Sequence, residues 1–183
     1  MRFFYGFSLS QDIKSELNEK IEFYKTLIPH EVTWVSEENL HITFQFIGTI
    51  KREDMDSVQT IFDEMAEKIK QQRFAIKGIE VFPPKSPKLI WISLTQKDRV
   101  VAQYLKTFQK NLKKYGIKIG VQDFRPHITL GRIKTELSTY QIGRIERDRT
   151  TFNYIKCNEI ALFESNLYEN GPIYSVLKTY NLQ

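Results

Sequence analysis

The sequence of 183 residues has little of three things that restrict what a protein can do: cysteine, histidine and long apolar runs. A single cysteine, Cys157, excludes an internal disulfide and any cysteine metal cluster, and it suits a reducing compartment. No window approaches the ~18 apolar residues of a membrane-spanning helix. The apolar run at the N-terminus ends too soon for a signal peptide. We therefore expect a soluble, cytoplasmic protein that does not associate with membranes.

Several motifs that carry common chemistries are also absent. The chain has no GxSxG turn that would present a nucleophilic serine, and no glycine-rich phosphate-binding loop. The zinc spacings HExxH and CxxC are missing, so the possible ligands His30, His41, His127 and Cys157 would have to meet from distant parts of the chain. We expect no metal site and no cofactor, and we place His30, in the polar sequence PHE, on the surface.

The composition that is present describes an ordinary globular protein with a basic surface. Lys and Arg number 27 against 22 Asp and Glu, which gives a net charge of +5 and a pI near 9.2. That charge suits a polyanionic partner such as RNA, although many basic proteins bind none. With 41% hydrophobic residues, the chain is expected to form a single domain over residues 1–183. Nothing in it requires an oligomer, so we expect a monomer.

Two hydrophobic periodicities alternate along the chain. Period-two alternation predicts strands at 2–9, 41–50, 74–82, 89–94, 124–133, 152–163 and 173–182. Apolar residues at helical spacing predict helices over 13–27, 55–69 and 101–115, and a shorter one at about 136–147. Turns are predicted at the proline-rich 83–88 and at YENGP, residues 168–172. The order strand–helix–strand–helix–strand thus occurs twice, which predicts two copies of one unit that pack as one body around a shared cleft.

A near-identical tetrapeptide marks the same strand in each copy. HITF begins at His41 and HITL begins at His127, 86 residues later. On a strand, residues i and i+2 point to the same face, so each histidine projects together with its threonine, Thr43 or Thr129. Two imidazoles near their usual pKa of about 6.5 can divide the work at neutral pH: one neutral, one protonated. One can then take a proton from a nucleophile while the other protonates a leaving group, as phosphodiester cleavage requires.

The paired motifs and their surroundings resemble a known family. MRFFYGFSL, WVSEENLHITFQFIG, VFPPKSPKLIWISL, FRPHITLGRI and IYSVLKTYNL are together similar to the 2H phosphoesterases. More narrowly, they resemble the RNA 2′,3′-cyclic phosphodiesterases, also called 2′-5′ RNA ligase-like proteins. The resemblance implies a bilobal α+β fold of duplicated strand–helix units, with two antiparallel sheets facing a central cleft. It also implies metal-independent hydrolysis of 2′,3′-cyclic phosphate ends of RNA or nucleotides to 2′-phosphates, reversible as 2′-5′ ligation.

The same resemblance assigns roles to six residues. His41 would protonate the leaving 3′ oxygen and His127 would activate water, while Thr43 and Thr129 would hold the non-bridging phosphate oxygens. Phe46 would stack on a base and Arg132 would bind phosphate.

Strict alternation argues against these last two residues, because it turns both away from the histidines. A bulge at Gly131 could turn Arg132 inward. Arg125 is in phase with His127 and is a second candidate phosphate ligand or a surface charge, and Trp34 and Trp91 are expected in the core.

Two alternatives remain open from the sequence. One is a related enzyme that cleaves 2′-5′ linkages or another cyclic nucleotide. The other is an RNA-binding protein without catalytic activity, although an idle site has no need to keep both histidines and both threonines.

Overall fold

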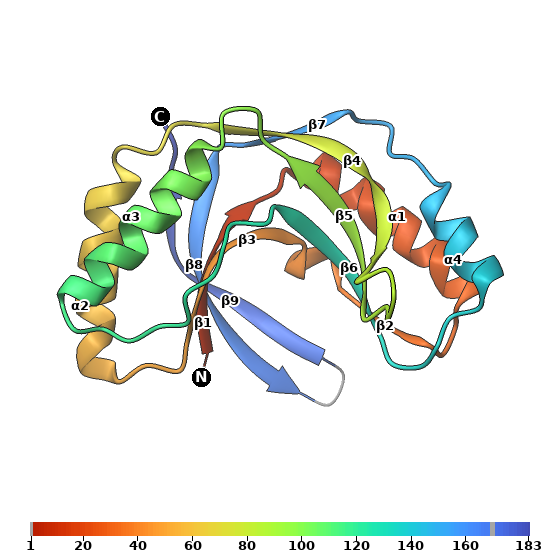
Figure 1. Cartoon of the computed structure of the whole chain (residues 1–183), viewed down its shortest axis with the longest axis horizontal. Helices are drawn as coiled ribbons and strands as arrows, with labels where there is room; N and C mark the ends of the chain where they lie inside the picture. The colour runs from red at the N-terminus through yellow and green to blue at the C-terminus, as the bar shows by residue number, and fades with distance from the viewer. Residues whose placement is uncertain (1, 169–170) are drawn as a thin grey trace.

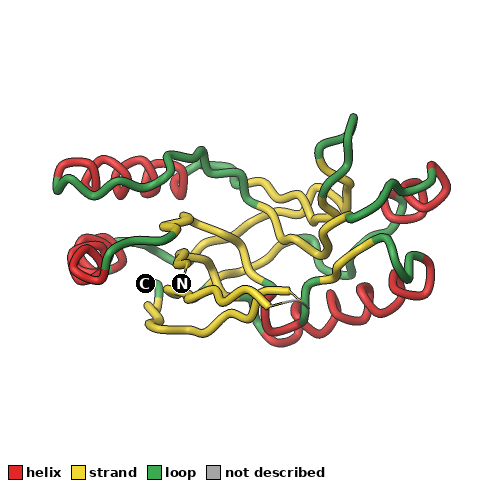
Figure 2. Tube along the Cα trace, turned by 90° about the horizontal axis from the view of Figure 1, so that it is seen from below, coloured by secondary structure: helices red, strands yellow, loops and turns green. Residues whose placement is uncertain are grey.

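The computed structural model describes residues 2–168 and 171–183, and its strands and helices follow the predicted order. The strands are β1 (Arg2–Ser8), β2 (Val32–Trp34), β3 (His41–Gly48), β4 (Gln72–Phe82), β5 (Leu89–Thr95), β6 (His127–Ile133), β7 (Tyr154–Cys157), β8 (Glu159–Tyr168) and β9 (Gly171–Asn181). The helices are α1 (Gln11–Leu27), α2 (Arg52–Ala66), α3 (Val100–Lys114) and α4 (Thr139–Glu146), with a 3-10 turn, η1 (Glu37–Asn39). The helices lie at the two ends of the molecule and the strands between them (Figures 1 and 2).

The strands form two antiparallel sheets. The first sheet has the order β3-β1-β8-β9 and the second has the order β2-β6-β5-β4-β7. Helices α2 and α3 pack on the first sheet, where Tyr5 stacks on Phe62 at 3.7 Å and meets Phe108 edge-on at 5.6 Å. Helices α1 and α4 cover the second sheet, where Tyr24 stacks on Trp34 at 5.7 Å. The predicted duplicated α+β fold with two antiparallel sheets is confirmed.

Each sheet combines strands from both copies of the repeat. In the first sheet β1 and β3 are joined by β8, and in the second β5 and β6 are joined by β4. The two copies therefore exchange their last strand, so neither lobe is a continuous half of the sequence. The exchange also divides the single strand predicted at 152–163. At Asn158 the chain passes from β7, in the second sheet, to β8, in the first.

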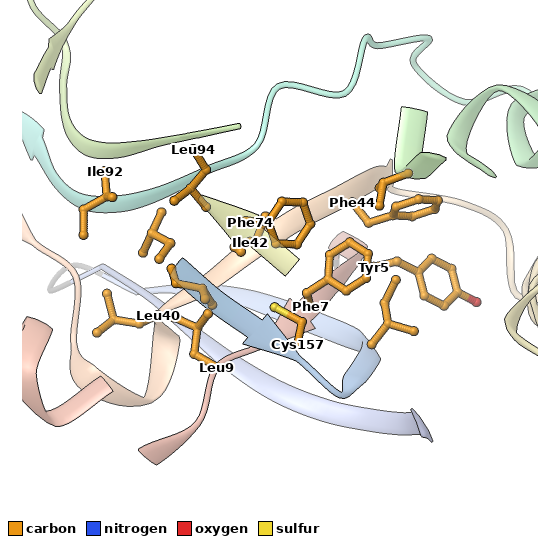
Figure 3. Close-up of a cluster of buried hydrophobic side chains, with 14 of the residues drawn as sticks. Tyr5, Phe7, Leu9, Leu40, Ile42, Phe44, Phe74, Ile92, Leu94 and Cys157 are labelled. Atoms are coloured by element: carbon orange, nitrogen blue, oxygen red, sulfur yellow. The ribbon is translucent and has the colours of Figure 1, made fainter. Parts of the chain in front are cut away.

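One hydrophobic core extends across the two sheets. Figure 3 shows side chains from β1, β3, β4, β5 and β7 packed together, among them Phe7, Phe44, Phe74 and Ile92, all fully buried. Cys157 lies in the same core, where burial raises the pKa of its thiol to about 12, so the thiol stays protonated and unreactive. The core fixes the alternation of β3 and β6, because Ile42 and Ile128 point into it and turn the histidines the other way.

A few local features differ from the prediction. The short β2 and η1 were not predicted, since three residues show too little periodicity. Strand β6 begins at His127, three residues later than expected. The predicted turn at 168–172 includes residues 169 and 170, which lie outside the described residues. His30 is exposed, as expected. No helix within residues 2–168 and 171–183 is long and apolar enough to cross a membrane.

Candidate active site

Six of the seven residues predicted to form the site line one cavity of about 220 Å³. From β3 come His41, Thr43 and Phe46, and from β6 come His127, Thr129 and Arg132. Short segments of β2, β5 and β9 complete the walls, so the cavity lies between the two sheets. Arg125 does not line this cavity; its guanidinium lies over the ring of Phe82, 5.2 Å from the centroid.

Two equivalent β-bulges bring Phe46 and Arg132 into the cavity. In β3 the pairing with β1 passes from Thr43 directly to Gln45, so Phe44 is the extra residue. In β6 the pairing with β5 passes from Thr129 to Gly131, so Leu130 is the extra residue. An extra residue reverses the alternation beyond it. The expectation that strict alternation turns both side chains away from the histidines was therefore wrong.

Glutamine side chains support the bulge in β3. The Gln122 amide donates from Nε2 to the carbonyl of Phe44 at 3.2 Å, and its Oε1 accepts from the Phe46 N–H at 3.4 Å. Gln45 is fully buried and donates to the Phe46 carbonyl at 2.6 Å, while its own oxygen accepts from Gln109 at 2.6 Å. These bonds satisfy backbone groups that the bulge removes from the ladder.

Backbone from β2 supports the bulge in β6 instead. The N–H of Val35, just after β2, donates to the carbonyl of Leu130 at 2.8 Å. Residue 131 is a glycine because β2 passes too close for a side chain: a Cβ there would lie 2.5 Å from Val32 Cγ1 and 3.0 Å from Trp34 Cε3. The predicted bulge exists, but the extra residue is Leu130, and Gly131 is needed for the close approach of β2.

Both imidazole rings are oriented in the same way. The Nδ1–H of His41 donates to the carbonyl of Asn39, and the Nδ1–H of His127 donates to the carbonyl of Arg125, each at 2.7 Å. This bond fixes the tautomer and leaves Nε2 of each ring for the cavity side. His41 Nε2 accepts from the Thr43 hydroxyl at 2.9 Å. Within the described residues, His127 Nε2 has no such partner.

Aromatic rings hold the two histidines in place. His41 lies against Phe4 at 4.7 Å and Tyr174 at 5.4 Å, and His127 lies against Trp91 at 4.6 Å. The strand beside His41 leaves room for the ring through Gly6, where a Cβ would lie 3.1 Å from His41 Cδ2. The rings therefore have little freedom to rotate away from the cavity.

Burial lowers the pKa of both histidines. The pKa of His41 falls to about 4, chiefly through burial and also through the nearby positive charges of His127, Lys14 and Arg132. The pKa of His127 is lowered by burial first, then by Arg125 and Arg132. The expectation of two groups near 6.5, one of them protonated at neutral pH, was wrong for the free protein. Both rings are neutral there, and the positive charge that faces the cavity is that of Arg132.

Several residues of the cavity were not predicted. Tyr174 on β9 lies between His41 and the opposite sheet; burial raises the pKa of its hydroxyl, while Arg132 opposes that rise. Asn39 supplies the carbonyl that orients His41, and its side chain donates to the Pro172 carbonyl at 2.7 Å. Trp34 lines the cavity as well as packing on Tyr24, whereas Trp91 is buried as predicted. The alternation of β9 could be recognised in the sequence. The sequence did not show that one face of β9 lies beside the histidine motifs.

The described residues that line the cavity include no acidic and no sulfur side chain. Among the residues that the structure describes, no three His, Cys, Asp or Glu side chains come together in a way that could hold a metal ion. The donors that surround the cavity are imidazole, hydroxyl, guanidinium and amide groups, which suit a phosphate oxygen.

Comparison with known proteins identifies the family to which this chain belongs. The family described as LigT-like phosphoesterase matches residues 8–91 and 94–174, which include both motifs, and the chain belongs to this family. The resemblance to 2H phosphoesterases is thus confirmed. An RNA 2′,3′-cyclic phosphodiesterase of Aquifex aeolicus is 32% identical over 100% of this chain and 97% of the relative. An RNA 2′,3′-cyclic phosphodiesterase of Methanocaldococcus jannaschii is 30% identical over 98% of this chain and 100% of the relative.

Solved structures share the fold. A protein of Thermus thermophilus superposes with a TM-score of 0.79 at 22% identity, covering 100% of this chain and 98% of that one. LigT of E. coli, in complex with 3′-AMP, superposes with a TM-score of 0.71 at 22% identity, covering 99% and 97%. The two-sheet arrangement is therefore shared with these solved structures.

Proposed function

We propose that the protein hydrolyses the 2′,3′-cyclic phosphate at the end of an RNA or nucleotide and produces a 2′-phosphate. One observation carries the proposal. Two histidines on opposite sheets line one cavity, and each has Nδ1 bound by a backbone carbonyl so that Nε2 faces the cavity, free in His127 among the described residues and bonded to the Thr43 hydroxyl in His41. That is the arrangement that a reaction with one proton to remove and one to supply requires.

The reaction can be written with each proton assigned. His127 Nε2 accepts a proton from a water molecule, whose oxygen forms a bond to phosphorus. The bond between phosphorus and the 3′ oxygen breaks, and His41 Nε2 donates its proton to that oxygen. The product carries a phosphomonoester on the 2′ oxygen and a free 3′ hydroxyl. His41, whose pKa is about 4 in the free protein, is a strong acid once protonated and suits a poor alkoxide leaving group.

The negative charge of the substrate raises the pKa of His41 and so favours its protonated form. Both imidazoles are neutral in the free protein because burial and Arg132 disfavour their charged forms. A phosphodiester carries one negative charge, which offsets Arg132 and raises the pKa of both rings when it enters the cavity. Thr43, Thr129 and Arg132 then donate hydrogen bonds to the non-bridging oxygens as charge develops on them. These groups provide electrostatic stabilisation without a metal ion.

The relatives favour this substrate over others. The proteins of Aquifex aeolicus and Methanocaldococcus jannaschii are named RNA 2′,3′-cyclic phosphodiesterases. E. coli LigT was solved with 3′-AMP, with ATP and with NADP+, all of them nucleotides. The half-exposed Phe46 beside the cavity offers a face on which a base can stack. At high concentrations of RNA ends, a 5′ hydroxyl could replace water: His127 would accept its proton, its oxygen would bond to phosphorus, the bond to the 3′ oxygen would break with a proton from His41, and a 2′-5′ linkage would form.

The test is product identification. The protein is incubated in excess EDTA with a short RNA ending in a 2′,3′-cyclic phosphate, and the product is assigned by ³¹P NMR. We expect a 2′-phosphate, no product from 3′,5′-cyclic substrates, and slower cleavage of 2′-5′-linked substrates than of the cyclic end. A 3′-phosphate product, or preferred cleavage of a 2′-5′ linkage, would contradict the proposal. Absence of cleavage would favour the RNA-binding alternative.

A further inference from the structure

We propose that a basic rim beside the cavity binds the phosphates of the RNA strand upstream of the cyclic end, so that the preferred substrate is a chain and not a mononucleotide. The basic rim consists of Lys85, Lys88 and Lys134. The inference rests on the proposed function. It adds a second binding site, outside the cavity that holds the reacting phosphate.

The rim adjoins residues of the active cavity in the sequence and in the strand register. Thr33, Arg132 and Leu89 form one row across β2, β6 and β5, and all three line the cavity. One residue further out, the Ile133 N–H donates to the Lys88 carbonyl at 2.9 Å. Lys88 and Ile133 belong to a second hollow, of about 510 Å³, between the β4–β5 loop and the segment after β6. Figure 1 shows that loop beside the ends of β2 and β6.

The lysines of the rim are exposed and have no ion-pair partner among the described residues. Lys85, Lys88 and Lys134 are all exposed, and the ion pairs of the described chain involve other lysines. Glu136 is the one carboxylate that lines the same hollow within the described part of the chain. These lysines extend the positive charge of Arg132 outward from the cavity. Each ammonium group is a point charge that can bind a phosphate.

The other edges of the cavity are less suited to a polyanion. At η1, the edge carries Glu37 and Glu38. At the β8–β9 hairpin, the edge is apolar, with Leu167 62% exposed and Ile173 56% exposed. Of these three edges, the repulsion or desolvation of phosphates is lowest over the lysines. Charge therefore favours the rim over the η1 edge and the hairpin edge.

The loop that carries two of the lysines is held in shape before RNA binds. Prolines at 83, 84 and 87 restrict its backbone, the Ser86 N–H donates to the Pro83 carbonyl at 3.2 Å, and the Lys88 N–H donates to the Phe82 carbonyl at 2.8 Å. A preformed loop loses little entropy when it binds, so the phosphate contacts contribute more of their energy to affinity.

The experiment compares two substrates and two triple variants. The substrates are 2′,3′-cyclic AMP and an RNA hexamer that ends in the same cyclic nucleotide. The rim variant is Lys85→Gln/Lys88→Gln/Lys134→Gln. The matched control is Lys106→Gln/Lys110→Gln/Lys113→Gln, which removes the same charge from α3, away from the cavity.

We expect the rim variant to raise KM for the hexamer about tenfold or more, and to change kcat/KM for the mononucleotide less than twofold. The dependence of log KM on log salt should also become shallower by about 2, since each phosphate contact to a single strand contributes about 0.7. The control variant should behave as the unmodified protein. Equal effects of the two variants, or equal effects on the two substrates, would overturn the proposal.

Failure of the proposed function would look different, because the unmodified protein would then cleave neither substrate. In that case binding of a fluorescent hexamer with a 3′-phosphate is measured by anisotropy. Weaker binding by the rim variant alone still supports the rim, whereas equal binding by both variants contradicts it.

Discussion

The two motif strands, β3 and β6, have nearly the same sequence and the same bulge, yet they are supported in different ways. In β3 the bulge is stabilised by Gln122 and the buried Gln45, which reach the backbone through their side chains. In β6 the backbone N–H of Val35 stabilises the bulge, and the absence of a side chain at Gly131 lets the neighbouring strand β2 approach closely. The geometry of the two motifs is thus duplicated, while the contacts that support it are not.

The difference in support extends to the histidines. His41 is enclosed by Phe4, Phe163 and Tyr174, and it bonds to Thr43. His127 packs on Trp91, and its Nε2 is unpartnered among the described residues. A symmetric site would leave the roles of acid and base undetermined. In the proposed mechanism, the unequal surroundings favour His41 as the acid and His127, whose Nε2 has no partner among the described residues, as the base.

Removing either histidine should have the largest effect. His41→Ala and His127→Ala should each reduce kcat on a 2′,3′-cyclic nucleotide by about 10²- to 10⁴-fold, because each takes away one proton-transfer group. His30→Ala removes the exposed third histidine and should leave kcat unchanged. Full activity in either motif variant would show that the pair does not act together.

The equivalent positions Arg132 and Phe46 should differ in what they control. Arg132→Gln should lower kcat/KM by about 10²-fold. It should also raise the pKa of both histidines, because the guanidinium lowers both. Phe46→Leu should weaken nucleotide binding by about 1–3 kcal/mol, as expected for a lost stack, and should leave both pKa values in place. Titration of the imidazole protons by NMR measures the shifts. Unchanged pKa values in Arg132→Gln would contradict an effect of the guanidinium on the two histidines.

The supports can be tested through stability, with a smaller effect. Gly131→Ala should reduce the free energy of unfolding by about 1–3 kcal/mol, since the new methyl group overlaps Val32 and Trp34. Gly78→Ala is the control, because a Cβ there meets nothing within 4 Å. Urea denaturation gives both values. Equal stability of the two variants would mean that β2 can move away from β6 without cost.

Much of the fold and the shared face of the four motif residues could be predicted from the sequence because they depend on local patterns. His41, Thr43, His127 and Thr129 lie two apart on strands, and the apolar Ile42 and Ile128 fix which face they occupy. The strand-by-strand order followed from alternation and helical spacing in the same way.

What could not be predicted depends on residues far apart in the chain. The inward turn of Phe46 needs Gln122, 76 residues away, and the bulge at Leu130 needs Val35. The alternation within β4 and β8 does not indicate which sheet each strand joins, so their exchange between the sheets could not be predicted. The low pKa of His41 follows from burial by Phe163 and Tyr174 at the other end of the sequence. Arg125 is in phase with the site, yet its side chain lies over Phe82.

The pH dependence of kcat/KM tests the central claim most directly. For the unmodified protein we predict a bell with its maximum below pH 6.5, because the pKa values of both histidines are lowered in the free protein. His41→Ala should retain only the limb that rises with pH, as the base loses its proton. His127→Ala should retain only the limb that falls with pH, as the acid loses its proton. The opposite pattern would exchange the roles of the two histidines, and a complete bell in either variant would contradict paired acid–base catalysis.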